Sequence, residues 1–153
     1  MLFYTLIVCF IISLLITPLI KKLAVSIGAT DKPNQRKVHQ FTMPRLGGLA
    51  IFISFIIGML ILKPLNPAFI PIIIGSSIIV ITGICDDLFE LSAKYKLIGQ
   101  LAAAFIVVFL GDLQVLFINL PFGGHLEFGY LSIPFTILWI VGITNAINLI
   151  DGL

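Results

Sequence analysis

Two apolar stretches of this sequence end in side chains that can bind cations and phosphates. Asp86 and Asp87 follow the run ITGIC, while Asn145, Asn148 and Asp151 stand three residues apart in TNAINLID. Carboxylate and amide oxygens suit Mg²⁺ or Mn²⁺, and Mg²⁺ usually takes one or two carboxylates together with substrate phosphates. The pattern therefore predicts a divalent-cation site that handles a phosphate-containing substrate.

The paired aspartates are unusual because each is expected at the carboxyl end of a helix. That end carries partial negative charge, so a nearby anionic side chain costs some tenths of a kcal/mol up to about 1 kcal/mol. A bound cation would reverse this penalty. The simpler interpretation is that Asp86, Asp87 and Asp151 are hydrated residues marking where helices leave a membrane. Adjacent helical residues point about 100° apart, so we expect only one of Asp86 and Asp87 to bind an ion directly.

The spacing of Asn145, Asn148 and Asp151 predicts a polar stripe on an otherwise apolar helix. At 100° per residue the three side chains fall within about 120° of arc. Amides inside a membrane span are costly unless they face a site or the interior of a helix bundle. The alternative is that they join neighbouring helices through hydrogen bonds.

Basic residues and a constrained backbone fill the segment GATDKPNQRKVHQFTMPRLGGLAIF, which follows the first apolar stretch. The segment is suggestive of an anion site, and Lys94 and Lys96 after the paired aspartates add positive charge suited to phosphates. The Gly47-Gly48 pair at a helix start allows close approach of another backbone. Basic residues by themselves also serve as topology signals or contact anionic lipid headgroups.

Composition shows which elements must position these residues. Hydrophobic residues make up 59% of the 153, charged residues only 10%, and the mean hydropathy is +1.19. Soluble domains carry roughly 25% charged residues, so we expect an all-α, polytopic transmembrane helical bundle forming a single membrane domain over residues 1–153. A span needs about 20 apolar residues. Five stretches qualify, the fourth with the weakest boundaries: Leu2–Ile20, Leu46–Leu62, Pro67–Cys85, Leu97–Leu110 and Leu131–Ile150.

The distribution of Lys and Arg predicts how the chain crosses the cell membrane. Alternating spans place eight basic residues on one side and only Lys63 on the other. The positive-inside rule then puts the N-terminus outside. The ends of the third and fifth spans, with their carboxylates and amides, would face the cytoplasm beside the basic segment. The outer segment around Pro121–Gly124 is predicted to form a β-hairpin, interpreted as a capping loop near the bilayer surface.

These motifs together resemble the polyprenyl-phosphate N-acetylhexosamine-1-phosphate transferases, glycosyltransferase family 4. The shared patterns are DKPxxRKxH at Asp31–His39, PxxGG at Pro44–Gly48, the pair Asp86-Asp87, and NxxNxxDG beginning at Asn145. The family motif continues beyond Leu153 to a second Asp-Gly, and family members have further spans. We therefore expect this chain to be the N-terminal part of a longer enzyme and to be inactive alone.

The resemblance implies transfer of N-acetylglucosamine 1-phosphate from UDP-N-acetylglucosamine to undecaprenyl phosphate, with UMP released, for teichoic acid or other surface-polymer synthesis. It implies that Mg²⁺, or alternatively Mn²⁺, binds at the catalytic aspartates. The catalytic and metal-binding set is Asp86, Asp87 and Asp151, and the substrate-binding set is Lys37, His39, Lys94, Lys96, Asn145 and Asn148.

Several alternatives stay open. One is the sister activity, transfer of phospho-N-acetylmuramoyl-pentapeptide for peptidoglycan. Another is a truncated, non-catalytic partner of an intact transferase, and a third is a transporter that uses the aspartates for a coupling ion. Membrane lipids are expected neighbours, no nucleic-acid partner is expected, and a homo-oligomer is left open.

Overall fold

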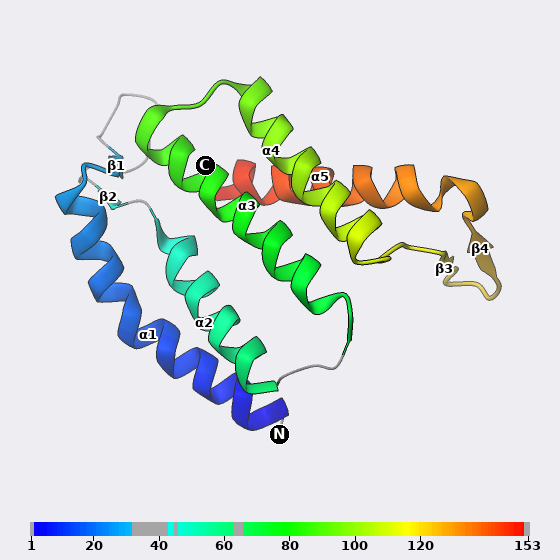
Figure 1. The fold of residues 1–153 in the computed structure, drawn as a ribbon, viewed down its shortest axis with the longest axis horizontal. Helices are drawn as coiled ribbons and strands as arrows, with labels where there is room; N and C mark the ends of the chain where they lie inside the picture. Colours follow the sequence, from blue (N-terminus) through cyan, green and yellow to red (C-terminus); the bar gives the residue numbers. More distant parts are fainter. Residues whose placement is uncertain (1, 32–42, 45, 63–65, 152–153) are drawn as a thin grey trace. The chain divides into compact units, whose positions relative to one another are not determined.

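The computed structural model describes residues 2–31, 43–44, 46–62 and 66–151, and they are mostly helical (Figure 1). A π-helix at Ile106–Leu110 (η1) continues the helix Ala93–Phe105, and a short 3-10 helix at Gly129–Leu131 (η2) leads into the helix Ser132–Asp151. The five α-helices are α1 (Leu2–Ser26), α2 (Gly47–Leu62), α3 (Phe69–Phe89), α4 (Ala93–Phe105) and α5 (Ser132–Asp151).

The helices confirm an all-α, polytopic membrane protein. Four helical segments are long and apolar enough to cross a bilayer: Leu2–Ser26, Phe69–Phe89, Ala93–Leu110 and Gly129–Leu149. The helix Gly47–Leu62 is equally apolar but shorter. Many large hydrophobic side chains on these helices are exposed in the chain, as expected where lipid replaces water as the solvent.

Three helices extend beyond the predicted spans. The first continues from Ile20 through two lysines to Ser26, and the third passes the paired aspartates to Phe89. The fourth begins at Ala93, four residues before the predicted start at Leu97. Hydropathy locates the part of a helix that lies in lipid, whereas backbone hydrogen bonding continues into the interface, where Lys is a good helix former.

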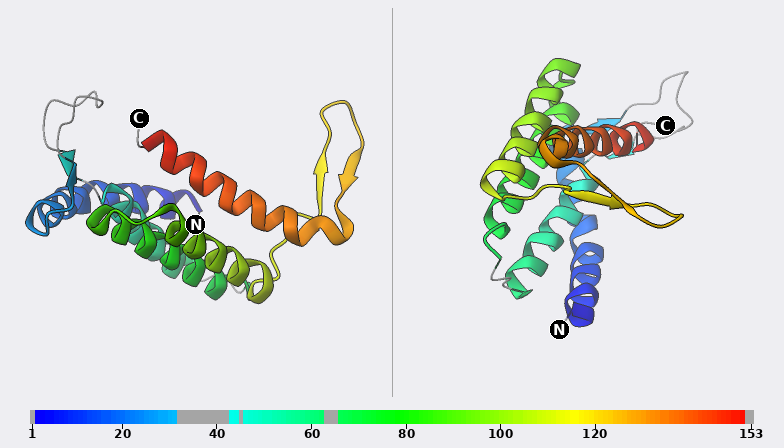
Figure 2. Two further views of the ribbon diagram at one scale, coloured as in Figure 1. Left: turned by 90° about the horizontal axis from the view of Figure 1, so that it is seen from above. Right: turned by 90° about the vertical axis from the view of Figure 1, so that its right-hand side faces the viewer.

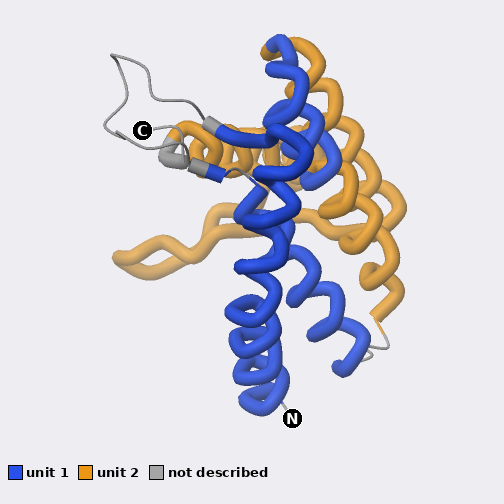
Figure 3. The backbone as a smooth tube through the Cα atoms, turned by 90° about the vertical axis from the view of Figure 1, so that its left-hand side faces the viewer, with its two compact units in different colours: residues 1–65, 80–92 blue, residues 66–79, 93–153 orange. Residues whose placement is uncertain are grey.

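The chain divides into two compact units, and α3 contributes to both (Figure 3). Unit 1 comprises residues 1–65 and 80–92, and unit 2 comprises residues 66–79 and 93–153. The paired aspartates therefore belong to unit 1, whereas the amide stripe of α5 belongs to unit 2.

Small residues let α1 and α2 approach closely in unit 1. The Cys9 thiol donates a hydrogen bond to the carbonyl oxygen of Ser54 over 3.3 Å. A Cβ atom on Gly58 would collide with the sulfur of Cys9. Packing between helices in lipid relies on such small side chains, because no hydrophobic effect drives the helices together there.

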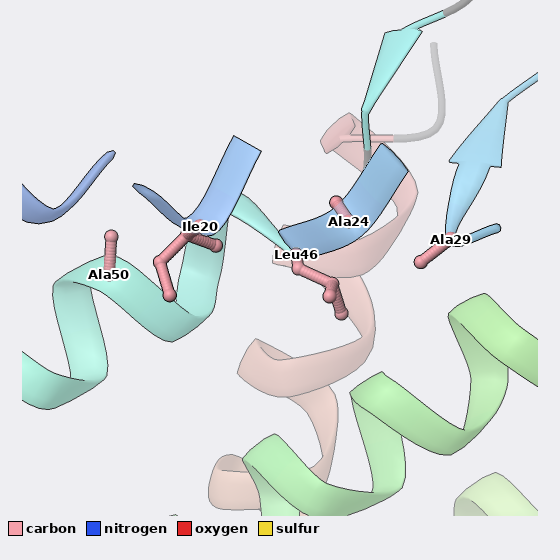
Figure 4. Close-up of a cluster of buried hydrophobic side chains, with 5 residues drawn as sticks. All are labelled: Ile20, Ala24, Ala29, Leu46 and Ala50. Carbon is pink, nitrogen blue, oxygen red and sulfur yellow. The ribbon is translucent and has the colours of Figure 1, made fainter. Parts of the chain in front are cut away.

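The buried cluster of unit 1 lies where α1 ends and α2 begins (Figure 4). Two two-residue strands, β1 (Thr30–Asp31) and β2 (Met43–Pro44), pair antiparallel just beyond it, with Thr30 opposite Pro44. This pairing brings together the two ends of the basic segment. The cluster consists of Ile20, Ala24, Ala29, Leu46 and Ala50.

Unit 2 contains the amino-terminal half of α3, α4 with its π-helical end, a β-hairpin and α5. A Cβ on Gly75 would come within 2.7 Å of the Val107 side chain, so this glycine permits α3 and the α4–η1 helix to pack closely. Strands β3 (Phe117–Asn119) and β4 (His125–Glu127) pair antiparallel, which confirms the predicted hairpin.

Candidate functional site

The last turn of α3 carries Asp86 and Asp87, both half-buried. Ile84 and Leu88 on the same helix pack against the buried cluster of unit 1. At 100° per residue, Asp86 points away from this packed face, and Asp87 lies at its flank, about 80° from the centre of the face. The structure thus gives the two carboxylates different surroundings, with Asp87 nearer the cluster.

The backbone ends α3 directly after the paired aspartates. Glu90 has a φ of 50°, in the left-handed region, and its N–H donates to the carbonyl oxygen of Asp86 over 2.9 Å. Left-handed residues commonly end helices, although glycine usually occupies that position. Because the helix stops here, both carboxylates stay within its final turn.

The base of the basic segment lies beside this turn of α3, within unit 1. Ala29 precedes β1, Leu46 follows β2, and both belong to the cluster against which Ile84 and Leu88 pack. Leu46 is buried although its φ is 73°. Strained backbone of this kind costs about 1–3 kcal/mol and persists only where the surroundings hold it. The structure therefore brings the last turn of α3 to the base of the segment that carries the DKPxxRKxH motif.

The most clearly defined polar contact of unit 2 joins α4 to α5. Asn145 Nδ2 donates to Gln100 Oε1 over 2.7 Å, and Gln100 Nε2 donates to Asn145 Oδ1 over 3.1 Å. Asn145 Nδ2 also donates to the carbonyl oxygen of Val141 over 2.9 Å. Gln100 is only 6% exposed, and burying an amide without such partners would cost about 1–3 kcal/mol.

These bonds favour the helix-joining alternative for Asn145, because they occupy both ends of its amide. Gln100 was missed as a polar residue of interest, although it is the single amide in the apolar run LIGQLAAAF. An isolated amide in a membrane span is itself a signal of a partner on another helix.

The other predicted site residues differ in how the structure places them. Asn148 is exposed on α5, and Asp151 is the last residue of that helix. Lys94 is exposed and Lys96 half-buried in the first turn of α4. Lys37 and His39 lie outside the described residues.

The predicted grouping of α3 and α5 residues around one metal stays a prediction, because these residues belong to different units. Among the residues that the structure describes, no group of three or more His, Cys, Asp or Glu side chains is placed to hold a metal ion. The oxygen ligands of Asp86 and Asp87 alone match the one or two carboxylates typical of Mg²⁺ with substrate phosphates.

Residues 69–153, more than half of the chain, match the model of glycosyl transferase family 4. The chain belongs to glycosyl transferase family 4. The match begins with α3 and includes both the paired aspartates and the amide stripe of α5.

Proteins similar in sequence to this chain carry the names of sugar-phosphate transferases. The probable undecaprenyl-phosphate N-acetylglucosaminyl 1-phosphate transferase of Bacillus subtilis is 48% identical over 96% of this chain and 42% of its own length. The undecaprenyl-phosphate alpha-N-acetylglucosaminyl 1-phosphate transferase of Salmonella typhimurium is 31% identical over 88% of this chain and 37% of its own length. The decaprenyl-phosphate N-acetylglucosaminephosphotransferase of Mycolicibacterium smegmatis is 32% identical over 94% of this chain and 38% of its own length.

The chain spans less than half the length of each of these relatives. No solved structure matches the chain.

Proposed function

We propose that this chain belongs to an enzyme that transfers N-acetylglucosamine 1-phosphate from UDP-N-acetylglucosamine to undecaprenyl phosphate. An oxygen of the lipid phosphate bonds to the phosphorus that carries the sugar. The bond from that phosphorus to the bridging oxygen breaks, and UMP leaves. The product is a lipid-linked pyrophosphoryl sugar, a starting unit for teichoic acid or another surface polymer.

One observation of the structure carries this proposal: within unit 1, the last turn of α3, which bears the two carboxylates, packs against the cluster at the base of the basic segment. A pyrophosphate substrate requires this combination, because phosphates bind basic groups and divalent cations while a carboxylate binds the cation. The names of the similar proteins from Bacillus and Salmonella support the choice of sugar and lipid carrier.

The proposed metal is Mg²⁺, with Mn²⁺ as an alternative. Asp86 and Asp87 would hold it, joined by Asp151, and the ion would stabilise negative charge that develops on the pyrophosphate. Asp87 lies nearer the basic segment than Asp86, as judged from the packed face of α3. We therefore assign Asp87 to the ion or the lipid phosphate and Asp86 to a supporting contact.

The remaining residues have separate proposed roles. Lys37, His39, Lys94 and Lys96 contact phosphates, and Asn148 contacts the nucleotide. Asn145 contributes less directly, because its amide is engaged by Gln100. The bond between these two amides fixes α5 to α4 three residues before Asn148 and so sets the direction in which Asn148 points. The site faces the cytoplasm, as the predicted positive-inside topology requires.

The test uses the complete gene expressed in membranes, with labelled UMP exchanged into UDP-N-acetylglucosamine. We expect Mg²⁺-dependent exchange that falls about 100-fold or more in Asp87→Asn, because loss of one preorganised charge-stabilising group costs 10²–10³ in rate. Glu90→Gln is the matched control, since it removes an exposed carboxylate from the same end of α3. UDP-N-acetylmuramoyl-pentapeptide should not replace the donor.

Exchange at the unsubstituted rate in Asp87→Asn would remove this residue from the reaction. Equal use of the muramoyl-pentapeptide donor would instead assign the enzyme to the peptidoglycan branch.

A further inference from the structure

The hairpin of unit 2 has one apolar face and one mainly polar face. Ile118 stands opposite Leu126, whereas Asn119 stands opposite His125 and Phe117 opposite Glu127. Successive side chains of a strand point to opposite faces, so Ile118 and Leu126 share one face. His125 and Glu127 share the other, where their side chains approach to 3.2 Å.

The apolar face extends past the paired residues, and no element in the described part of the chain covers it. By the same alternation Leu116 and Leu120 belong to it. The four aliphatic side chains of this face are between 40% and 61% exposed. Exposed aromatic rings stand at both ends of the hairpin, Phe122 in the turn and Tyr130 at the base. Aromatic residues are enriched where a protein meets the bilayer surface.

Contacts at its base fix the direction of the hairpin relative to α5. The Ser132 hydroxyl donates to Gln114 Oε1 over 3.1 Å, and the Val115 N–H donates to the Thr136 hydroxyl over 2.9 Å. Ser132 and Thr136 are both buried. The strand pair runs across the axis of α5 instead of continuing along it (Figure 2). Since α5 belongs to a predicted membrane span, a hairpin crossing its end lies along the bilayer surface.

An aromatic stack indicates which face of the hairpin is turned toward the bilayer. Phe128 follows Leu126 on the same side of the strand, and its ring stacks on Phe135 at a centroid distance of 4.1 Å. Phe135 in turn stacks on Trp139, one turn further into α5, at 6.0 Å. The apolar side of the hairpin therefore faces along α5 toward the interior of the span.

We propose that the apolar face of Leu116, Ile118, Leu120 and Leu126 inserts into the lipid leaflet at the amino end of α5. The opposite face, with Asn119, His125 and Glu127 and with the Phe117 ring against that of His125, lies in water. Lipid is the favoured occupant because membrane spans flank the hairpin on both sides. Four aliphatic side chains are also too few for a stable protein interface, which buries at least about 1,000 Å².

The test measures how deeply a single tryptophan side chain lies in the bilayer when it is placed at neighbouring positions of the hairpin. The chain is reconstituted in phosphatidylcholine vesicles. Trp139 is the one tryptophan of the sequence, so Trp139→Phe supplies a silent background that keeps an aromatic ring. Ile118→Trp and the matched control Asn119→Trp then place the probe on opposite faces of β3. We expect brominated acyl chains to quench the indole at position 118 at least about twofold more than that at 119, with the order reversed for aqueous acrylamide.

Equal quenching at the two positions would overturn the proposal. Protection of the Ile118→Trp indole from both quenchers would also overturn it, since a protein surface would then cover the face. Leu126→Trp and His125→Trp repeat the comparison on β4, in case a β3 variant disturbs the hairpin. No readout depends on sugar transfer, so the proposed enzyme activity and this proposal can fail separately.

Discussion

The two ends of α5 use their polar residues differently. At the amino end, Ser132 and Thr136 are buried and bonded to the residues that precede the hairpin. In the carboxyl half, Asn145 pairs with Gln100, and Asn148, one turn further on, is exposed.

This difference separates structural polar groups from those available to a ligand. A polar group in an apolar helix is stabilised when a neighbouring element supplies its hydrogen bonds. The amino end meets this condition within unit 2, because the hydroxyl groups of Ser132 and Thr136 both donate to neighbouring oxygen atoms. The exposed amide of Asn148 is a group of α5 that a ligand can reach, and the helix ends at Asp151. Substitutions along the helix should therefore affect activity at one end and stability at the other.

The largest effect is expected at the carboxyl end. Asp151→Asn should lower UMP exchange about 100-fold, because it removes a proposed metal-binding charge. Thr136→Val at the amino end is the control and should leave exchange nearly unchanged. Exchange is measured in membranes with equal amounts of protein. Comparable losses in the two variants would show that both ends of α5 are needed for the reaction.

A smaller effect on substrate affinity is expected from Asn148→Ala. Loss of one amide hydrogen bond to the nucleotide, worth about 1.4 kcal/mol, should raise the KM for UDP-N-acetylglucosamine about tenfold. Asn119→Ala removes an exposed amide from the hairpin and should not change KM. If the KM of Asn148→Ala equals that of the unsubstituted enzyme, Asn148 does not contact the donor.

Substitutions at the contact between Gln100 and Asn145 should lower the stability of the chain. Gln100→Leu leaves the Asn145 amide without its partner and should destabilise the chain in detergent by about 1 kcal/mol, measured by denaturant titration. The double variant Gln100→Leu/Asn145→Leu leaves no unpaired amide and should recover part of this loss. Additive destabilisation in the double variant would show that the two amides do not stabilise each other.

The smallest effect is expected at the amino end. Ser132→Ala removes the hydrogen bond to Gln114, in the segment before the hairpin, and should cost about 0.6 kcal/mol if the bond is worth as much as the average one between membrane helices. Its UMP exchange should stay at the level of the unsubstituted enzyme. A fall in exchange as large as that of Asn148→Ala would show that the amino end also takes part in substrate binding.

The sequence by itself determined the class of protein and the placement of its helices along the chain. Uncharged apolar runs such as that ending at Ile20 are long enough to cross the hydrocarbon of a bilayer as a helix, so composition suffices to locate the spans. The hairpin was also predictable, because the turn Pro121–Gly124 interrupts two arms rich in apolar residues. The last residues of α1 and α3 were not predictable from hydropathy, since Lys21 and Asp87 continue a helix without adding to its apolar character.

The tertiary structure decided which polar residues of α5 are used for packing. The stripe of Asn145, Asn148 and Asp151 covers about 120° of the helix, and its spacing does not show which member meets a neighbouring helix. The position of Gln100 on α4 selects Asn145. A hydrogen bond between amides 45 residues apart depends on how two helices are rotated against each other, and short-range sequence patterns do not contain that rotation.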